Sequence, residues 1–182
     1  MNLLELASTL EESGDFHLAR LLTLLRIFAG ASGEEPIEGI TKLVKLDFLL
    51  RYPVLLERAL LERGGNPAEV KVQPHERQSV ESRMVRYRFG PWDHRYHQFV
   101  NTLVAKGLAH VSLRGRTVVI GITKQGQELA DQLIKTESFS DLANRSRLLK
   151  RHCNLSATNL MEFIYDTFPE ISSLRLGEEI AL

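Results

Sequence analysis

The sequence has a single cysteine, Cys153, and no excess of either charge. A lone cysteine excludes an internal disulfide and fits a reducing compartment. The 23 lysines and arginines are balanced by 23 aspartates and glutamates, so the net charge is zero. A chain without net charge has no overall field that attracts nucleic acid or acidic lipid. Any basic surface must therefore be local.

Long apolar runs and low-complexity segments are also missing. The first residues, MNLLELASTLEES, carry acidic side chains where a secretory signal needs basic ones, and no apolar run approaches the length of a membrane span. We therefore expect a cytoplasmic protein without membrane contact. Its 182 residues suffice for one sizeable core, or for a core with an appendage.

The sequence contains no motif of a known catalytic site: no phosphate-cradling glycine loop, no nucleophile elbow and no acidic pair with a credible partner. His94 and His97, three residues apart on an expected helix, could supply two metal ligands, but no third ligand is near them. His152 beside Cys153 follows two basic residues, yet adjacent side chains rarely orient each other for catalysis. We predict a protein that is not an enzyme and has no cofactor, metal or small-molecule substrate.

The most informative stretch is residues 84–122, which begins with an expected strand. Apolar side chains alternate there with arginines, so one face is apolar and the other cationic; the apolar members are Val85, Tyr87 and Phe89. Gly90 and Pro91 should end this strand, because proline cannot donate to a strand ladder. A helix is then expected from near Trp92, with Asp93 as its cap.

The expected helix after Pro91 leads into a hairpin. Its apolar side chains recur every three or four residues and predict one buried stripe: Tyr96, Phe99, Val100, Leu103 and Val104. Gly107 is placed to end the helix in a left-handed conformation. Two alternating strands follow, joined at Arg114-Gly115 by a turn that could exceed two residues, since Arg-Gly is a weak hairpin turn. This order resembles the second half of a winged helix-turn-helix.

Helices are also expected at residues 16–28, 37–50 and 54–63, and after the hairpin. Thr123, Ser138 and Ser156 can cap the three later helices, and Pro169 should stop the last. The sequence thus predicts a mainly α protein with a small β-hairpin (α+β), built on a winged helix-turn-helix core with additional N- and C-terminal helices. The core should span residues 1–137, with an irregular, flexible insertion at about 64–83, and residues 138–182 should form a helical extension packed on it.

Five arginines could line one basic face that meets phosphates or an acidic protein. They are Arg86 and Arg88 on the first strand, Arg95 on the central helix, and Arg114 and Arg116 at the hairpin turn. The alternative is that these arginines lie on an ordinary solvent-exposed surface among acidic side chains and bind no ligand, which the zero net charge favours. A winged helix serves in protein contacts as often as in DNA binding, and the fold alone does not decide between them.

Three motifs together resemble a known family. They are ITKLVKLDFLLRYP at residues 40–53, FGPWDHRYHQFVNTLVAKGL at 89–108 and SATNLMEFIYDTFPEI at 156–171. They look like the small middle component of bacterial ABC-three-component systems, of which Lamassu-type anti-phage defence is the best-known case. The resemblance begins at about residue 18, and it supplies no catalytic residues to carry over.

The resemblance implies a winged-helix accessory subunit of an anti-phage or anti-plasmid defence complex. Its partners would be a coiled-coil ATPase related to the structural-maintenance-of-chromosomes proteins (SMC-like) and an effector nuclease, which it would hold together until foreign DNA is sensed. Tyr165 and Phe168 would then be candidates for docking a partner helix. The hairpin and Arg95 would lie near double-stranded DNA.

Two other functions stay open. The first is a stand-alone winged-helix transcriptional regulator that dimerises through its C-terminal helices and places the helix after Pro91 in the major groove. It predicts tight, sequence-selective and salt-sensitive DNA binding by the lone protein. The second is an antitoxin-like adaptor that occludes an effector's active site.

Overall fold

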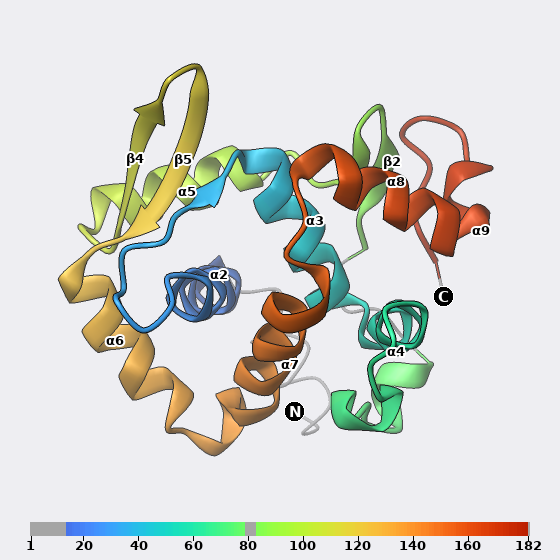
Figure 1. Ribbon diagram of the computed structural model, residues 1–182, viewed down its shortest axis with the longest axis horizontal. Helices are drawn as coiled ribbons and strands as arrows, with labels where there is room; N and C mark the ends of the chain where they lie inside the picture. The colour runs from blue at the N-terminus through green and yellow to red at the C-terminus, as the bar shows by residue number, and fades with distance from the viewer. Residues whose placement is uncertain (1–13, 79–82, 182) are drawn as a thin grey trace, which may run out of the picture.

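The computed structural model describes residues 14–78 and 83–181 of the chain, which form a mainly helical α+β fold (Figure 1). Its helices are α2 (Gly14–Phe28), α3 (Ile40–Arg51), α4 (Pro53–Glu62), α5 (Tyr96–Ala105), α6 (Lys124–Ile134), α7 (Glu137–Cys153), α8 (Ala157–Thr167) and α9 (Pro169–Ser172). Two 3-10 turns, η1 (Pro67–Val70) and η2 (His75–Arg77), follow α4. The strands are β1 (Ile37–Glu38), β2 (Val85–Tyr87), β3 (Gly90–Trp92), β4 (Ala109–Arg114) and β5 (Thr117–Ile122).

The larger sheet contains the expected hairpin and one strand that the sequence did not predict. Its antiparallel order is β1-β5-β4, with Ile37 opposite Ile120. Arg114 pairs with Thr117, so the hairpin turn has only two residues, and Gly115 in that turn has a φ of +65°. The prediction missed β1 because two residues are too few to show an alternating pattern.

Residues 90–92 form a strand, and the expectation that a helix begins near Trp92 is wrong. Val85 pairs with Trp92, and Tyr87 with Gly90, in a second antiparallel hairpin. Pro91 is tolerated there because this ladder has only two strands, and its missing N–H can face outward. Tyr87 at the hairpin end is exposed and not packed against the core.

Asp93 is not the N-cap of α5, which begins at Tyr96 after Arg95, but its carboxylate accepts a hydrogen bond from the backbone N–H of Arg95 in the turn before the helix. Gly107 ends the helix with a φ of +70°, as predicted. The hydroxyls of Thr123 and Ser156 accept hydrogen bonds from backbone N–H groups in the first turns of α6 and α8, also as predicted. Local signals were therefore sufficient at the helix ends marked by Gly107, Thr123 and Ser156.

The expectations for the later helices need two corrections and one addition. Ser138 is not a cap, because α7 already begins at Glu137. Leu129 was expected on the buried face of α6 but is exposed, whereas Ala130 is fully buried. Pro169 follows the end of α8, as predicted, and also opens the short helix α9.

The described part of the expected insertion, residues 64–78, packs against α7 through Arg145. The Arg145 Nε donates to the Val70 carbonyl at 2.9 Å, and both terminal nitrogens donate to the Glu76 carboxylate at 2.7 Å. Arg145 and Val70 are buried. Because η1 and η2 are too short for periodicity, the sequence could not distinguish them from irregular chain.

Three helices of the core meet at a buried carboxylate, Asp47 of α3. Arg20 of α2 donates to both of its oxygens, at 2.6 and 2.8 Å, and the hydroxyl of Tyr96 in α5 donates to one of them. Burial alone would raise the pKa of Asp47, but the charge and hydrogen bonds of Arg20 outweigh it and hold that pKa below its usual range. The ionised carboxylate therefore joins α2, α3 and α5.

Replacing Asp47 by asparagine should lower the free energy of unfolding by about 3–5 kcal/mol, because Arg20 would be left as an uncompensated buried charge. Urea denaturation of the two proteins measures the difference. Asp131→Asn is the matched control, since it breaks a half-exposed ion pair with Arg26 and should cost about 1 kcal/mol or less. Equal losses in both variants would contradict a structural role for Asp47.

Candidate partner and nucleic-acid interfaces

Arg86, predicted to contact DNA, is held by the protein itself. Its Nη1 donates to the Leu174 carbonyl at 2.8 Å, and its guanidinium lies 5.7 Å from the centre of the Tyr165 ring. The hydroxyl of Tyr165 in turn donates to the carbonyl of Tyr87 at 2.9 Å. Arg86 and Tyr165 therefore fasten the β2–β3 hairpin to the C-terminal segment, although each was predicted to contact a partner or DNA.

Phe168, the other predicted partner contact, is fully buried, so it cannot dock a partner helix in this fold. Its ring meets Phe48 edge-on at 6.4 Å, and Arg58 covers its face at 4.9 Å. The expectation was wrong because the apolar stripe of α8 faces the core, and a helical period alone does not say what covers it.

Arg95 is also engaged, by Asp93 just before α5. Its Nη2 donates to the Asp93 carboxylate at 2.7 Å, and its guanidinium lies over the Phe99 ring at 5.5 Å. Arg51 donates to the same carboxylate at 3.1 Å. Burial would raise the pKa of Asp93, but the hydrogen bonds from Arg95 outweigh it and lower that pKa. Two guanidinium groups thus share one nearly buried carboxylate.

The remaining predicted arginines lie at the ends of the two hairpins, which project to the same side of the molecule (Figure 1). Arg88 follows β2 and lies 5.3 Å from the centre of the Phe89 ring. Arg114 ends β4 and pairs with Glu38 at 3.5 Å, with both side chains exposed. Arg116 is exposed in the hairpin turn. The structure therefore brings these three arginines to one side, whereas Arg86 and Arg95 are engaged by contacts within the protein.

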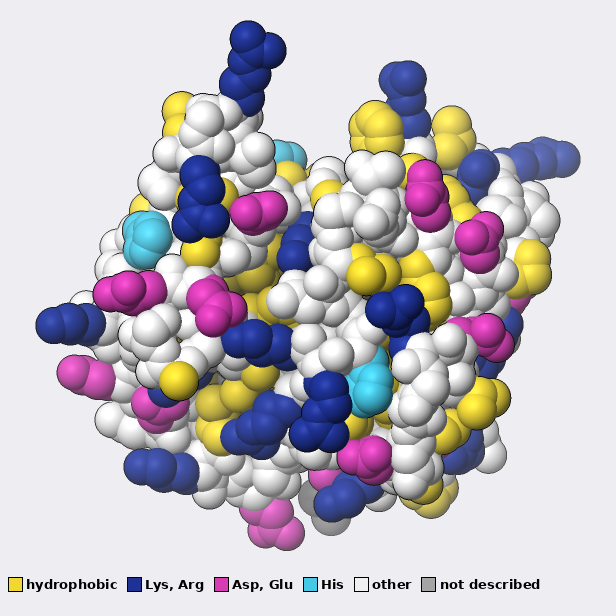
Figure 2. Space-filling model, in the orientation of Figure 1, with side chains coloured by type: hydrophobic (Ala, Val, Ile, Leu, Met, Phe, Trp, Pro, Cys, Tyr) yellow, Lys and Arg dark blue, Asp and Glu magenta, His cyan; other side chains and the backbone are white. Residues whose placement is uncertain are grey.

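Exposed apolar side chains accompany these arginines. On the β2–β3 hairpin, Tyr87 and Phe89 are 50% and 52% exposed, and on the β4–β5 hairpin Leu113 is 73% exposed, opposite the exposed Val118. Figure 2 shows Lys or Arg side chains beside hydrophobic ones at both projections. Clustered exposed apolar side chains are typical of protein interaction sites.

Neither the Cys153 thiol beside His152 nor the pair His94 and His97 forms the site that the sequence allowed. Cys153 is fully buried, and burial raises the pKa of its thiol to about 11, so the group is protonated at neutral pH. His94 precedes α5 and does not share a helix with His97, whose ring meets Trp92 edge-on at 5.8 Å. Within residues 14–78 and 83–181, no group of three or more side chains is arranged to hold a metal ion.

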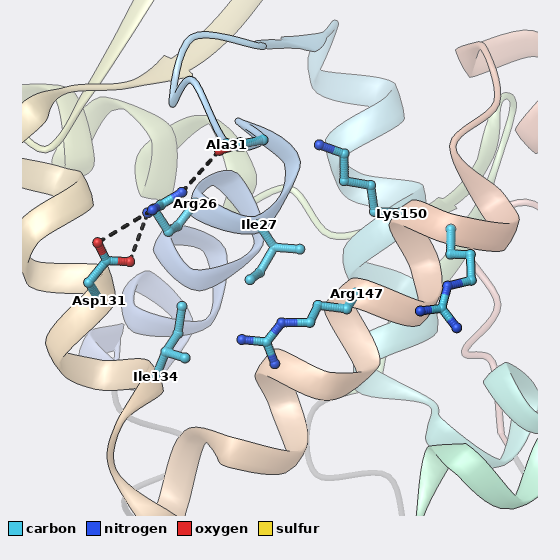
Figure 3. A pocket seen from close by; sticks show the side chains of 9 residues that line it. Arg26, Ile27, Ala31, Asp131, Ile134, Arg147 and Lys150 are labelled. Carbon is cyan, nitrogen blue, oxygen red and sulfur yellow. Dashed lines mark hydrogen bonds and ion pairs between the residues drawn. The ribbon is translucent and has the colours of Figure 1, made fainter.

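A pocket of about 460 Å³ lies where α2, α6 and α7 meet, and the sequence did not predict it. Figure 3 shows its lining, which combines four cationic side chains with two isoleucines and one aspartate: Arg26, Arg147, Lys150, Arg151, Ile27, Ile134 and Asp131. These residues come from three separate segments of the chain. Only the spacing of Arg147, Lys150 and Arg151 on one helix could have indicated a local basic surface.

His17 of α2 is a buried histidine beside the Asp47 ion pair. Its Nδ1 accepts a hydrogen bond from Arg20 at 2.8 Å, and its ring stacks on Phe99 at 5.1 Å. Burial, followed by the charges of Arg20 and Arg51, lowers the pKa of His17 to about 3. In the folded protein His17 is therefore neutral well below the pH at which it titrates in the unfolded chain.

The free energy of unfolding should consequently fall as the pH drops from 6.5 towards 3, because the unfolded chain binds a proton that folded His17 does not. His17→Asn keeps an acceptor for Arg20 and removes this titration. The free energy of unfolding of both proteins can be measured by urea denaturation between pH 7 and 4.5. Between pH 7 and 4.5 the free energy of unfolding should fall less for the variant than for the wild type. An equal fall in both proteins would contradict the lowered pKa of His17.

No protein-family model matches the chain, and neither a curated protein nor a solved structure matches it. In the described ranges, no helix is both long enough and apolar enough to cross a membrane. The function must therefore be argued from the geometry of the chain and from the sequence motifs.

Proposed function

We propose that the chain is a winged-helix accessory subunit, without catalytic activity of its own, that assembles other proteins. The observation that carries the proposal is the order and pairing of six elements. Along the chain they are α2, β1, α3, α5, β4 and β5, with the three strands paired in the order β1-β5-β4. A winged helix has the same helix, strand, helix, helix and hairpin, with its first strand against the last. The segment from α4 to β3 is then an insertion between the second and third helices.

The helix in the DNA-reading position supports a protein-contact role. In a helix-turn-helix this position belongs to α5, yet the sequence of that helix, YHQFVNTLVA, contains no lysine or arginine. Arg95, just before it, is engaged by Asp93. Because DNA affinity depends on cations that neutralise phosphates, such a helix is poorly suited to bind DNA by itself. The exposed apolar side chains of both hairpins suit a protein partner better.

The sequence motifs at residues 40–53, 89–108 and 156–171 suggest what is assembled. By their resemblance to the middle component of ABC-three-component systems, the partners are an SMC-like coiled-coil ATPase and an effector nuclease of a bacterial anti-phage or anti-plasmid defence complex. The exposed arginines Arg88, Arg114 and Arg116 could then contact double-stranded DNA within the complex, where the partners supply further contacts.

The second candidate function is a stand-alone transcriptional regulator. The observation that favours it is the cationic turn of the β4–β5 hairpin next to α5, where a wing would contact phosphates through Arg114 and Arg116. It requires tight DNA binding by the isolated protein, which the composition of α5 disfavours.

The test is to purify the tagged full-length protein from its native host through a salt wash and to identify bound proteins by mass spectrometry. We expect a coiled-coil ATPase in near-stoichiometric amount. The double variant Phe89→Ser/Leu113→Ser should reduce its recovery by about tenfold or more, as for a removed interface hot spot. Leu61→Ser is the matched control, because Leu61 is 62% exposed on α4, away from both hairpins.

Two outcomes would count against the proposal. Recovery of the protein alone, together with tight, salt-sensitive and sequence-selective DNA binding in a titration, would establish the regulator. Equal recovery of the ATPase with the double variant and with the Leu61 control would show that the exposed apolar side chains of the hairpins do not bind it.

A further inference from the structure

The pocket between α2, α6 and α7 combines an apolar floor with a cationic rim. Ile27 and Ile134 face each other across it from α2 and α6, and the side chain of Arg147 extends from α7 towards them (Figure 3). On the surface, Lys and Arg side chains gather over this region around a hydrophobic patch (Figure 2). Its volume, about 460 Å³, is sufficient for a docked side chain with its neighbours.

Two of its four cations are already neutralised within the fold. Arg26 donates to the Asp131 carboxylate at 2.8 Å and to the Gly30 carbonyl at 3.3 Å. Lys150 donates to the Phe28 carbonyl at 3.1 Å and pairs with Glu35 at 3.3 Å. These contacts satisfy carbonyls at the end of α2, so a structural role accounts for both cations.

Arg147 and Arg151 differ, because they are exposed and make no hydrogen bond or ion pair within the described ranges. They are four residues apart on α7 and therefore lie on one face of the helix. The dipole of α7 explains a cation such as Arg151 in its last turn, but it does not explain Arg147 one turn earlier. The rim thus presents two uncompensated guanidinium groups over an apolar floor.

This combination selects one class of occupant. Guanidinium groups bind carboxylates through paired hydrogen bonds, and the isoleucines offer contact to an apolar side chain. A nucleic-acid backbone would use the arginines but leave the isoleucines uncovered. We infer that this pocket docks an acidic amphipathic segment of a protein partner, with an apolar side chain against Ile27 and Ile134 and carboxylates on Arg147 and Arg151. The inference concerns a surface separate from the hairpin ends and does not depend on the proposed assembly.

Site-directed photo-crosslinking of the full-length protein in its native host tests this inference. Ala31 lines the pocket and is exposed, so p-benzoylphenylalanine at that position reports on the occupant without removing an arginine. The crosslinked peptide is then sequenced by mass spectrometry. We expect a segment of another protein in which an apolar residue is flanked by aspartates or glutamates.

The double variant Arg147→Gln/Arg151→Gln should reduce the crosslink yield by about tenfold or more, because both charged contacts are lost. Lys106→Gln/Arg175→Gln removes the same number of charges at exposed positions outside the pocket and both hairpins, and it should leave the yield within about twofold of the wild type. Both variants should unfold within about 2 °C of the wild type, as expected for exposed substitutions, so a lost crosslink would not reflect misfolding.

Other results would overturn the inference. They are crosslinks to nucleic acid, to a segment without acidic residues, to another copy of this chain or to its own residues, or no crosslink at all. A yield that is unchanged by Arg147→Gln/Arg151→Gln would also overturn it. None of these results would bear on the recovery of an ATPase through the hairpins, so the two proposals fail separately.

Discussion

The buried ion pair between Arg20 and Asp47 is the interaction on which the rest of the structure depends. It joins α2 to α3, and the hydroxyl of Tyr96 extends it to α5. Arg51 continues the network, since it donates to the Tyr96 hydroxyl and to Asp93. A buried charge without its partner costs far more than an exposed one, so only an arrangement that keeps all of these contacts is stable. The positions of the helices, and of the hairpins attached to them, follow from that requirement.

This network engages the most conspicuous polar groups of the core with one another. The carboxylates of Asp47 and Asp93 are held ionised by arginines, with pKa values below the usual range. A general acid or base at neutral pH needs a pKa near 7. The shifts here therefore indicate structural ion pairs, whereas the hairpins and the pocket beside α7 present exposed side chains.

The sequence predicted well the features that depend on a few neighbouring residues. The helix stop at Gly107, the caps at Thr123 and Ser156, and the hairpin of β4 and β5 follow from backbone preferences and alternation, which act over a few positions. The Asp47 network was not predicted, because its partners Arg20 and Tyr96 lie 27 and 49 residues away along the chain and no local pattern indicates such a pairing. Phe168 was misassigned for the same reason, since exposure depends on distant segments that cover it. The pocket combines three segments and could be found only in the structure.

We expect a core fixed by the Asp47 network to present separate surfaces to partners without rearranging. Amide hydrogen exchange of the free protein and of the purified assembly tests it most directly. We expect slower exchange on assembly at residues 85–92 and 111–118 and around residues 147–151, with the exchange of residues 43–50 of α3 unchanged. Altered exchange in α3, with the hairpins unaffected, would contradict it, because the partners would then act on the core itself.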